Sequence, residues 1–214
     1  TQGFGEPGDM RPWDCTWDAS TKPIRHVFTG SGWYRRKFRI PSGWTGKRVW
    51  LKVGDVRSQG WFWVNGTQVA WHEVFCGTYK YEITDLVKPG EEALFVIQVS
   101  NEVASRAGSR HSQNRWCGVL RALELEATPD VFIDDAWARG DFDHRAAEVN
   151  VKLDGVATVK SVGGLRLKVD VEGEVVQTPL TANRQSLTFK IPLRDFRPWS
   201  PESPNLYTAK VDLV

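Results

Sequence analysis

Polar side chains that could bind a sugar gather in one irregular stretch of the sequence, Ser100–Trp116. Guanidinium, imidazole, amide and hydroxyl groups donate and accept hydrogen bonds in geometries that suit pairs of sugar hydroxyls. A loop of this length inside a compact domain is usually either functional or disordered. The candidate binding residues in it are Arg110, His111, Ser112, Asn114, Arg115 and Trp116.

Tryptophan is the second chemical signal, because the chain contains 11 of them. Indole rings fill large cores, but they are also platforms on which sugar rings stack. In the predicted strand, Trp61 and Trp63 share one face and Phe62 and Val64 share the other. Only one of the two faces needs to belong to the core. Trp61, Trp63 and Trp71 therefore have two interpretations, a sugar-stacking surface or packing in the core and against another domain. Exposure of the pair would mark a binding or contact patch.

The sequence predicts no metal site and no cofactor. Its cysteines, Cys15, Cys76 and Cys117, form an odd set without the spacing of zinc ligands, and its four histidines are scattered. Two acidic pairs, Asp134-Asp135 and Asp141/Asp143, could hold calcium through oxygen ligands, although acids in turns are usually just solvated.

Charge and hydropathy exclude two classes of partner. The net charge of +2 is too balanced for a protein that binds nucleic acid without regard to sequence. The longest apolar runs have the length of strands, so we expect no membrane span. The N-terminus, TQGFGEPGDMRPWDC, lacks a signal peptide and an initiator methionine, which suggests a processed or truncated chain and leaves the compartment open.

Strands must position these residues, because apolar and polar side chains alternate with a period of two in most of the first half. The most diagnostic stretch is 61–87, in which Asn65-Gly66 predicts a tight hairpin turn and Tyr79, Tyr81 and Ile83 share one strand face. A further strand is predicted over Gly32–Ile40, with Arg36 among its apolar residues and therefore in need of a partner.

The remaining strands complete two sets. In the first half we predict strands over Arg48–Val53, over Ala93–Val99, which is apolar enough for a central strand covered on both faces, and over Val119–Ala127. After a linker at Thr128-Pro129-Asp130, five short strands are predicted over Val131–Ala138, Ala147–Leu153, Leu165–Val171, Ser186–Ile191 and Leu206–Leu213. No segment has a sustained helical period. The sequence thus predicts an all-β chain of two sandwiches, with domains at 1–128 and 129–214.

Four segments, in order, resemble the non-catalytic N-terminal modules of glycoside hydrolase family 2, which includes β-galactosidases, β-glucuronidases and β-mannosidases. These segments are Gly32–Pro41, Phe62–Asn101, Arg115–Pro129 and Arg197–Leu213. The resemblance implies a jelly-roll, galactose-binding-like sandwich followed by an immunoglobulin-like sandwich.

The family resemblance also implies where the chemistry is done. Its two catalytic glutamates lie on a (β/α)8 barrel that follows the second domain, and this chain ends at Val214, where that barrel would begin. We therefore predict no catalytic residue. Loops of the first domain typically reach toward the sugar pocket, so the resemblance implies that 112–116 contacts substrate; the alternative is a solvated loop that packs on the barrel.

Two functional hypotheses follow. In the first, the chain is the accessory part of a retaining, β-galactosidase-like glycoside hydrolase; it shapes the pocket and docks on the barrel, and alone is inactive. Its partners are then a carbohydrate substrate and the barrel, with no nucleic acid and no membrane. In the second, it is a self-standing carbohydrate-binding module. A weaker alternative is an adhesion protein that uses its immunoglobulin-like half.

Overall fold

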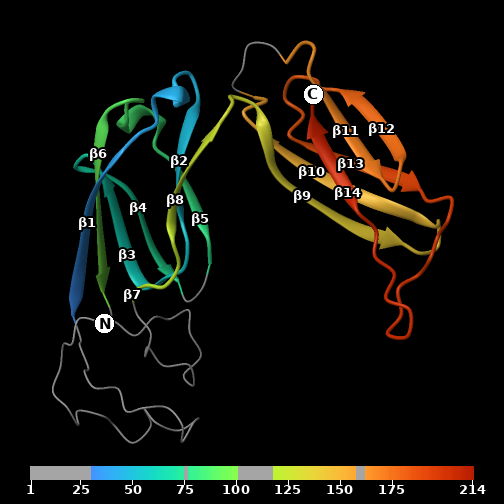
Figure 1. The fold of residues 1–214 in the computed structure, drawn as a ribbon, viewed down its shortest axis with the longest axis horizontal. Coiled ribbons are helices and arrows are strands. Elements are labelled where there is room, and N and C mark those ends of the chain that lie inside the picture. The colour runs from blue at the N-terminus through green and yellow to red at the C-terminus, as the bar shows by residue number, and fades with distance from the viewer. Residues whose placement is uncertain (1–29, 75–76, 101–117, 158–161) are drawn as a thin grey trace, which may run out of the picture. The chain divides into compact units, whose positions relative to one another are not determined.

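The computed structural model describes residues 30–74, 77–100, 118–157 and 162–214, and the regular secondary structure in these residues is almost entirely strand (Figure 1). The prediction of an all-β fold is confirmed. The chain divides into two compact units, Thr1–Ala127 and Thr128–Val214, each with strands and a core of its own.

The first unit is a jelly-roll sandwich of two antiparallel sheets. One sheet has the strand order β1-β6-β3-β4, and the short β7 pairs with β3; the other has the order β5-β2-β8. Only β3 and β4 of the first sheet's main path follow each other in sequence as well as in the sheet, so between the other strands the chain crosses repeatedly between the sheets. The strands are β1 (Ser31–Arg39), β2 (Arg48–Val53), β3 (Val56–Val64), β4 (Thr67–Val74), β5 (Tyr79–Glu82), β6 (Glu92–Ser100), β7 (Gly118–Val119) and β8 (Leu123–Thr128); two short 3-10 turns cover Ser42–Trp44 and Thr84–Leu86.

The inner faces of these sheets form the core of the first unit. Phe62 and Val64 of β3 are fully buried, so the face opposite Trp61 and Trp63 is the core face. Strand β6 is central, as predicted, but its burial alternates between buried and half-buried residues. The expectation that it is covered on both faces is therefore wrong for the described residues, because the second sheet packs on one side only.

The predicted hairpin turn joins β3 and β4. Asn65 and Gly66 both have positive φ, 48° and 83°, which is the left-handed region that this turn requires. The Asn65 side chain adds two long-range hydrogen bonds: its Nδ2 donates to the Leu86 carbonyl at 2.8 Å, and its Oδ1 accepts from the Leu94 amide at 2.8 Å. One asparagine thus makes the turn and fixes it to two other segments.

The strand predicted over Val119–Ala127 is divided in the structure. β7 pairs with β3 in one sheet, whereas β8 belongs to the other sheet. At the crossing, the amides of Leu120 and Arg121 both donate to the Asp55 carbonyl, at 2.8 and 3.2 Å. Clear period-two alternation begins only at Leu123, because Val119 and Leu120 are both apolar and Arg121 falls on the face of Leu123, so the predicted strand was extended across a gap in the pattern.

The second unit is a sandwich of two three-stranded sheets, with the orders β13-β10-β9 and β12-β11-β14. Its core is a separate aliphatic cluster that includes Val149, Leu167 and Val169. The strands are β9 (Phe132–Asp141), β10 (Ala146–Asp154), β11 (Arg166–Val171), β12 (Glu174–Pro179), β13 (Ser186–Pro192) and β14 (Ala209–Leu213).

Five of these six strands were predicted, and β12 was missed. It follows a tight turn in which Glu172 and Gly173 have φ of 50° and 90°. β12 lies at the edge of its sheet, where Val175 and Val176 are both exposed, so it lacks the apolar alternation that reveals a half-buried strand.

Candidate functional site

Four tryptophans lie on the outer face of the sheet β1-β6-β3-β4. Trp33 and Trp71 are 61% and 52% exposed, and Trp61 and Trp63 are half-buried. The pairing register aligns Trp33 of β1 with Gln98 of β6, Gln98 with Trp61 of β3, and Trp61 with Trp71 of β4. A single row of side chains therefore crosses four strands, three of them contributing an indole.

The four indoles form two contacting pairs. The rings of Trp33 and Trp63 stack with centroids 5.5 Å apart, although strand β6 lies between β1 and β3 in the sheet. Those of Trp61 and Trp71 lie 6.4 Å apart at a tilt of 48°. A bulge between Phe62 and Trp63 shifts the register of the β3–β4 pair next to these rings. The structure thus brings Trp61, Trp63 and Trp71 together and adds Trp33, which the sequence did not single out.

A second aromatic group lies on the inner side of the same unit. His72 of β4 is 7% exposed, and its Nδ1 lies 3.0 Å from the Tyr81 hydroxyl on the opposite sheet. Its ring also contacts Phe62 at 4.9 Å and Tyr79 at 4.7 Å. Burial lowers the pKa of His72, and a contact with the Val56 backbone opposes this effect. Sequence reasoning missed the group because it depends on a pairing between two sheets.

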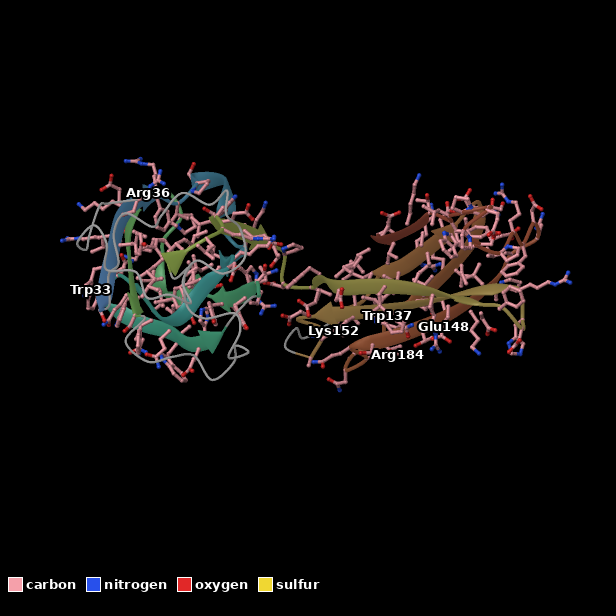
Figure 2. All side chains as sticks on the ribbon, turned by 90° about the horizontal axis from the view of Figure 1, so that it is seen from below. Trp33, Arg36, Trp137, Glu148, Lys152 and Arg184 are labelled. Atoms are coloured by element: carbon pink, nitrogen blue, oxygen red, sulfur yellow. The ribbon has the colours of Figure 1, made fainter. Side chains whose placement is uncertain are left out.

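Arg36 does not need the partner that its position among apolar residues suggested. Its side chain is exposed at the edge strand β1 (Figure 2). The inner face at this edge is not fully covered, and Tyr34 on the same side is also exposed.

The loop residues predicted to bind substrate lie outside the described residues. This concerns Arg110, His111, Ser112, Asn114, Arg115 and Trp116, and also the three cysteines. Their role stays a prediction.

Two of the four acidic residues considered for calcium, Asp134 and Asp141, contact basic side chains of the chain. Asp134 accepts a hydrogen bond from Lys152 at 2.7 Å, and Asp141 lies 2.9 Å from His144 Nδ1. Among the described residues, no group of three or more His, Cys, Asp or Glu is placed to hold a metal ion. Nor does the described part of the chain contain a helix that is long and apolar enough to cross a membrane.

The second unit carries a polar network that sequence reasoning also missed, on the outer face of the sheet β13-β10-β9 (Figure 2). Arg139 bonds Glu148 through Nε at 3.0 Å, and the Asn150 amide donates to the same carboxylate at 3.3 Å. Hydrogen bonding by Arg139 holds the pKa of Glu148 below its usual range. Trp137, paired in register with Asn150, is 52% exposed beside it.

Comparison with known protein families now adds to this geometry. Residues 18–129, more than half of the chain, match the model described as glycosyl hydrolases family 2, sugar binding domain. The chain belongs to glycosyl hydrolase family 2. Residues 131–214 match a second model of the same family, so the two matches follow each other almost without a gap.

Relatives in glycosyl hydrolase family 2 are much longer than this chain. A β-galactosidase of Streptococcus thermophilus is 26% identical over 96% of this chain, which corresponds to 21% of that protein. A β-glucuronidase of Paenibacillus borealis is 25% identical over 94% of this chain and 35% of its own length. The chain therefore spans about a fifth to a third of these relatives.

Solved structures of the family share the fold. A family 2 member from Bacteroides cellulosilyticus matches 98% of this chain and 32% of its own with a TM-score of 0.70 and 21% identity. The β-glucuronidase 3 of Bacteroides uniformis matches 87% of this chain and 26% of its own with a TM-score of 0.69 and 23% identity. At this identity the likeness concerns the fold, an all-β architecture that the sequence also predicted.

Proposed function

We propose that this chain is the non-catalytic N-terminal part of a family 2 glycoside hydrolase, which hydrolyses O-glycosidic bonds as a complete enzyme. The observation that carries the proposal is the tandem match to two consecutive family 2 domains in a chain that spans 21% of its β-galactosidase relative. In this role the two sandwiches dock on a barrel that follows them and help to shape its sugar pocket.

Three carboxylates of the described residues lack the property required of a glycosidase acid. A glycosidase acid needs a raised pKa so that it is protonated when it meets the leaving group. Hydrogen bonds from Arg48, His144 and Arg139 instead lower the pKa of Glu82, Asp141 and Glu148, in that order. Each of the three accepts hydrogen bonds from a neighbouring side chain of the chain, so none of them matches the acid of a glycosidase.

The test compares the 214-residue chain with the full product of its gene. We expect the chain alone to leave aryl β-galactosides and aryl β-glucuronides intact, and the full product to hydrolyse one of them. Reading the gene beyond Val214 is the cheapest first step. A stop codon with no barrel downstream would contradict the proposal, and so would hydrolysis by the purified 214-residue chain.

A self-standing carbohydrate-binding module is the second candidate. The observation in its favour is the exposure of Trp33 and Trp71 on one sheet face, since indoles open to solvent can stack on sugar rings. The same gene reading separates the two candidates, because a module predicts a reading frame without a barrel together with measurable binding to a glycan.

A further inference from the structure

The outer face of the sheet β1-β6-β3-β4 combines ring surface with fixed hydrogen-bonding groups. Each of the two indole pairs places one well-exposed ring beside a half-buried one: Trp33 with Trp63, and Trp71 with Trp61. The half-buried ring supports its partner from below or beside, so the exposed ring is held in place before a ligand arrives. Such preorganisation lowers the entropic cost of binding.

The row across the sheet sets the dimensions of this face. Neighbouring strands lie about 4.8 Å apart, so the backbone positions of Trp33 and Trp71, three strand spacings apart, are separated by roughly 14 Å. The indoles of Trp61 and Trp63 lie on the same face between these two positions. A surface of this length accommodates more than one sugar ring, and its indole rings are flat.

Amide groups lie between and beside these rings. Gln98, in the centre of the row, donates from Nε2 to Ser31 Oγ at 3.1 Å, which fixes its amide plane. An amide has a second N–H and a carbonyl oxygen as well. One row away, Gln59 Nε2 donates to Glu73 Oε2 at 3.3 Å. Fixed amides and a carboxylate next to indoles are the groups that recognise the hydroxyls around an apolar ring face.

The charge of this face favours a neutral ligand. Lys37 of β1 lies 3.9 Å from the Glu92 carboxylate of β6, and Glu73 is an acid at the β4 side. Arg35 and Arg39 are also exposed on this face, and both belong to the edge strand β1. A groove for single-stranded nucleic acid also uses stacked aromatic rings, but it adds a positively charged track for the phosphates. Here Arg35, Lys37 and Arg39 all lie on the edge strand β1, whereas the row of Trp33, Gln98, Trp61 and Trp71 carries no charge, so these cations form no positive track along the rings.

We propose that this face, defined by Trp33, Trp61, Trp63, Trp71 and Gln98, binds a neutral oligosaccharide. The pyranose rings stack their C–H faces on Trp33 and Trp71, and Gln98 bonds hydroxyls between them. The site goes beyond the proposed accessory function, because it needs only residues of this chain. It also differs from the loop 100–116, which is the predicted contact with the substrate of the complete enzyme.

The test measures binding of soluble neutral polysaccharides to the 214-residue chain by titration calorimetry and by affinity electrophoresis. The polysaccharides are galactan, arabinoxylan and mixed-linkage β-glucan. We expect binding to at least one of them. Trp33→Ala and Trp71→Ala should each weaken it roughly five- to tenfold, as loss of one ring stack implies, and the double variant should abolish it. Trp71→Tyr should retain part of the affinity, because it keeps a ring.

Two matched controls come from the second unit. Trp199 is 60% exposed and Trp137 is 52% exposed, close to the values of Trp33 and Trp71. Trp199→Ala and Trp137→Ala should leave the affinity unchanged. Thermal unfolding of all variants checks the fold, and exposed side chains of this kind should change it little.

Three results with the neutral polysaccharides would overturn the proposal. They are no binding to any of the neutral polysaccharides, binding that survives the double variant, and equal losses in the control variants. Preferential binding of single-stranded DNA or polygalacturonate would assign the face to an anionic ligand and also reject it. Because the titration uses this chain alone, none of these results bears on whether a barrel follows Val214. The proposed function is therefore tested separately.

Discussion

At the scale of single residues, Asn65 carries more of the first unit than its place in a turn indicates. Its backbone occupies the left-handed region, and its side chain reaches both the Leu86 carbonyl and the Leu94 amide. Few residues other than glycine adopt this conformation readily, and glycine lacks the side chain. Asparagine is therefore the residue type that satisfies both demands at once.

Replacing Asn65 by Gly separates these two roles. The positive φ is kept, while both side-chain hydrogen bonds are lost, so we expect the free energy of unfolding to fall by about 1–2 kcal/mol. Urea denaturation of the chain measures it. Asn183→Gly is the control: Asn183 also has positive φ, 67°, but no side-chain hydrogen bond to another described residue is known for it. Equal effects of the two substitutions would show that the Asn65 hydrogen bonds contribute nothing.

His72 makes the stability of the first unit depend on pH. Burial lowers its pKa below the ordinary value of 6.5, so the folded state holds the neutral ring. As the pH falls below 6.5, the unfolded chain takes up the proton first, which favours unfolding. The stabilisation is thus complete above that value and is lost toward the lowered pKa, with a slope of at most about 1.4 kcal/mol per pH unit.

His72→Gln should therefore flatten the decrease in unfolding free energy between about pH 7.5 and 5.5 relative to the unsubstituted chain. Denaturation at a series of pH values measures this difference. Tyr81→Phe removes the hydroxyl that lies beside His72 but keeps the titrating ring, so its pH dependence should persist. If His72→Gln leaves the pH profile unchanged, His72 is not the group responsible.

At the scale of elements, the crossing from β7 to β8 depends on a close approach at Gly54. Its amide donates to the Ala122 carbonyl at 3.1 Å. A Cβ at this position would lie 2.7 Å from that carbonyl oxygen and 2.7 Å from the Cβ of Arg121. The backbone of the crossing would have to move to admit it, so glycine is needed here for space.

Gly54→Ala should lower the free energy of unfolding by about 1–3 kcal/mol, the usual cost of inserting a methyl group into a packed site. Gly43→Ala is the matched control, because a Cβ there meets no atom within 4 Å. Thermal and urea unfolding of both variants compare them. Similar stability of the two would mean that the crossing can relax around a side chain.

At the scale of the whole molecule, each unit has its own core. The buried cluster of the first unit contains residues between Ile40 and Val99, and that of the second contains residues between Val131 and Leu193. The chain changes from one cluster to the other near Thr128, where the two compact units also divide. A domain is expected to fold around such a core by itself.

We therefore expect residues 129–214, expressed alone, to fold into a β-sandwich that unfolds in one cooperative transition. Circular dichroism and amide chemical-shift dispersion provide the measurement. Leu167→Ala, which truncates a fully buried side chain, should cost this unit about 2–5 kcal/mol, and exposed Leu206→Ala is its control. A polypeptide without cooperative unfolding would contradict the predicted domain boundary.

The sequence by itself determined the features that depend on neighbours along the chain. Alternation with a period of two gave most strands and the all-β class, and Asn65-Gly66 gave the hairpin, since both signals are local. Its failures have a local cause as well. The exposed edge strand β12 has no alternation, and near Leu120 one strand was predicted across a short gap in the alternation.

Only the tertiary structure decided which distant residues meet. Trp33 joins Trp61, Trp63 and Trp71 because β6 lies between β1 and β3, an order that alternation cannot specify. His72 meets Tyr81 because two sheets pack face to face. Strand pairing between segments far apart in sequence depends on the packing of the whole domain, so the tryptophan face became visible only when the strands had been placed.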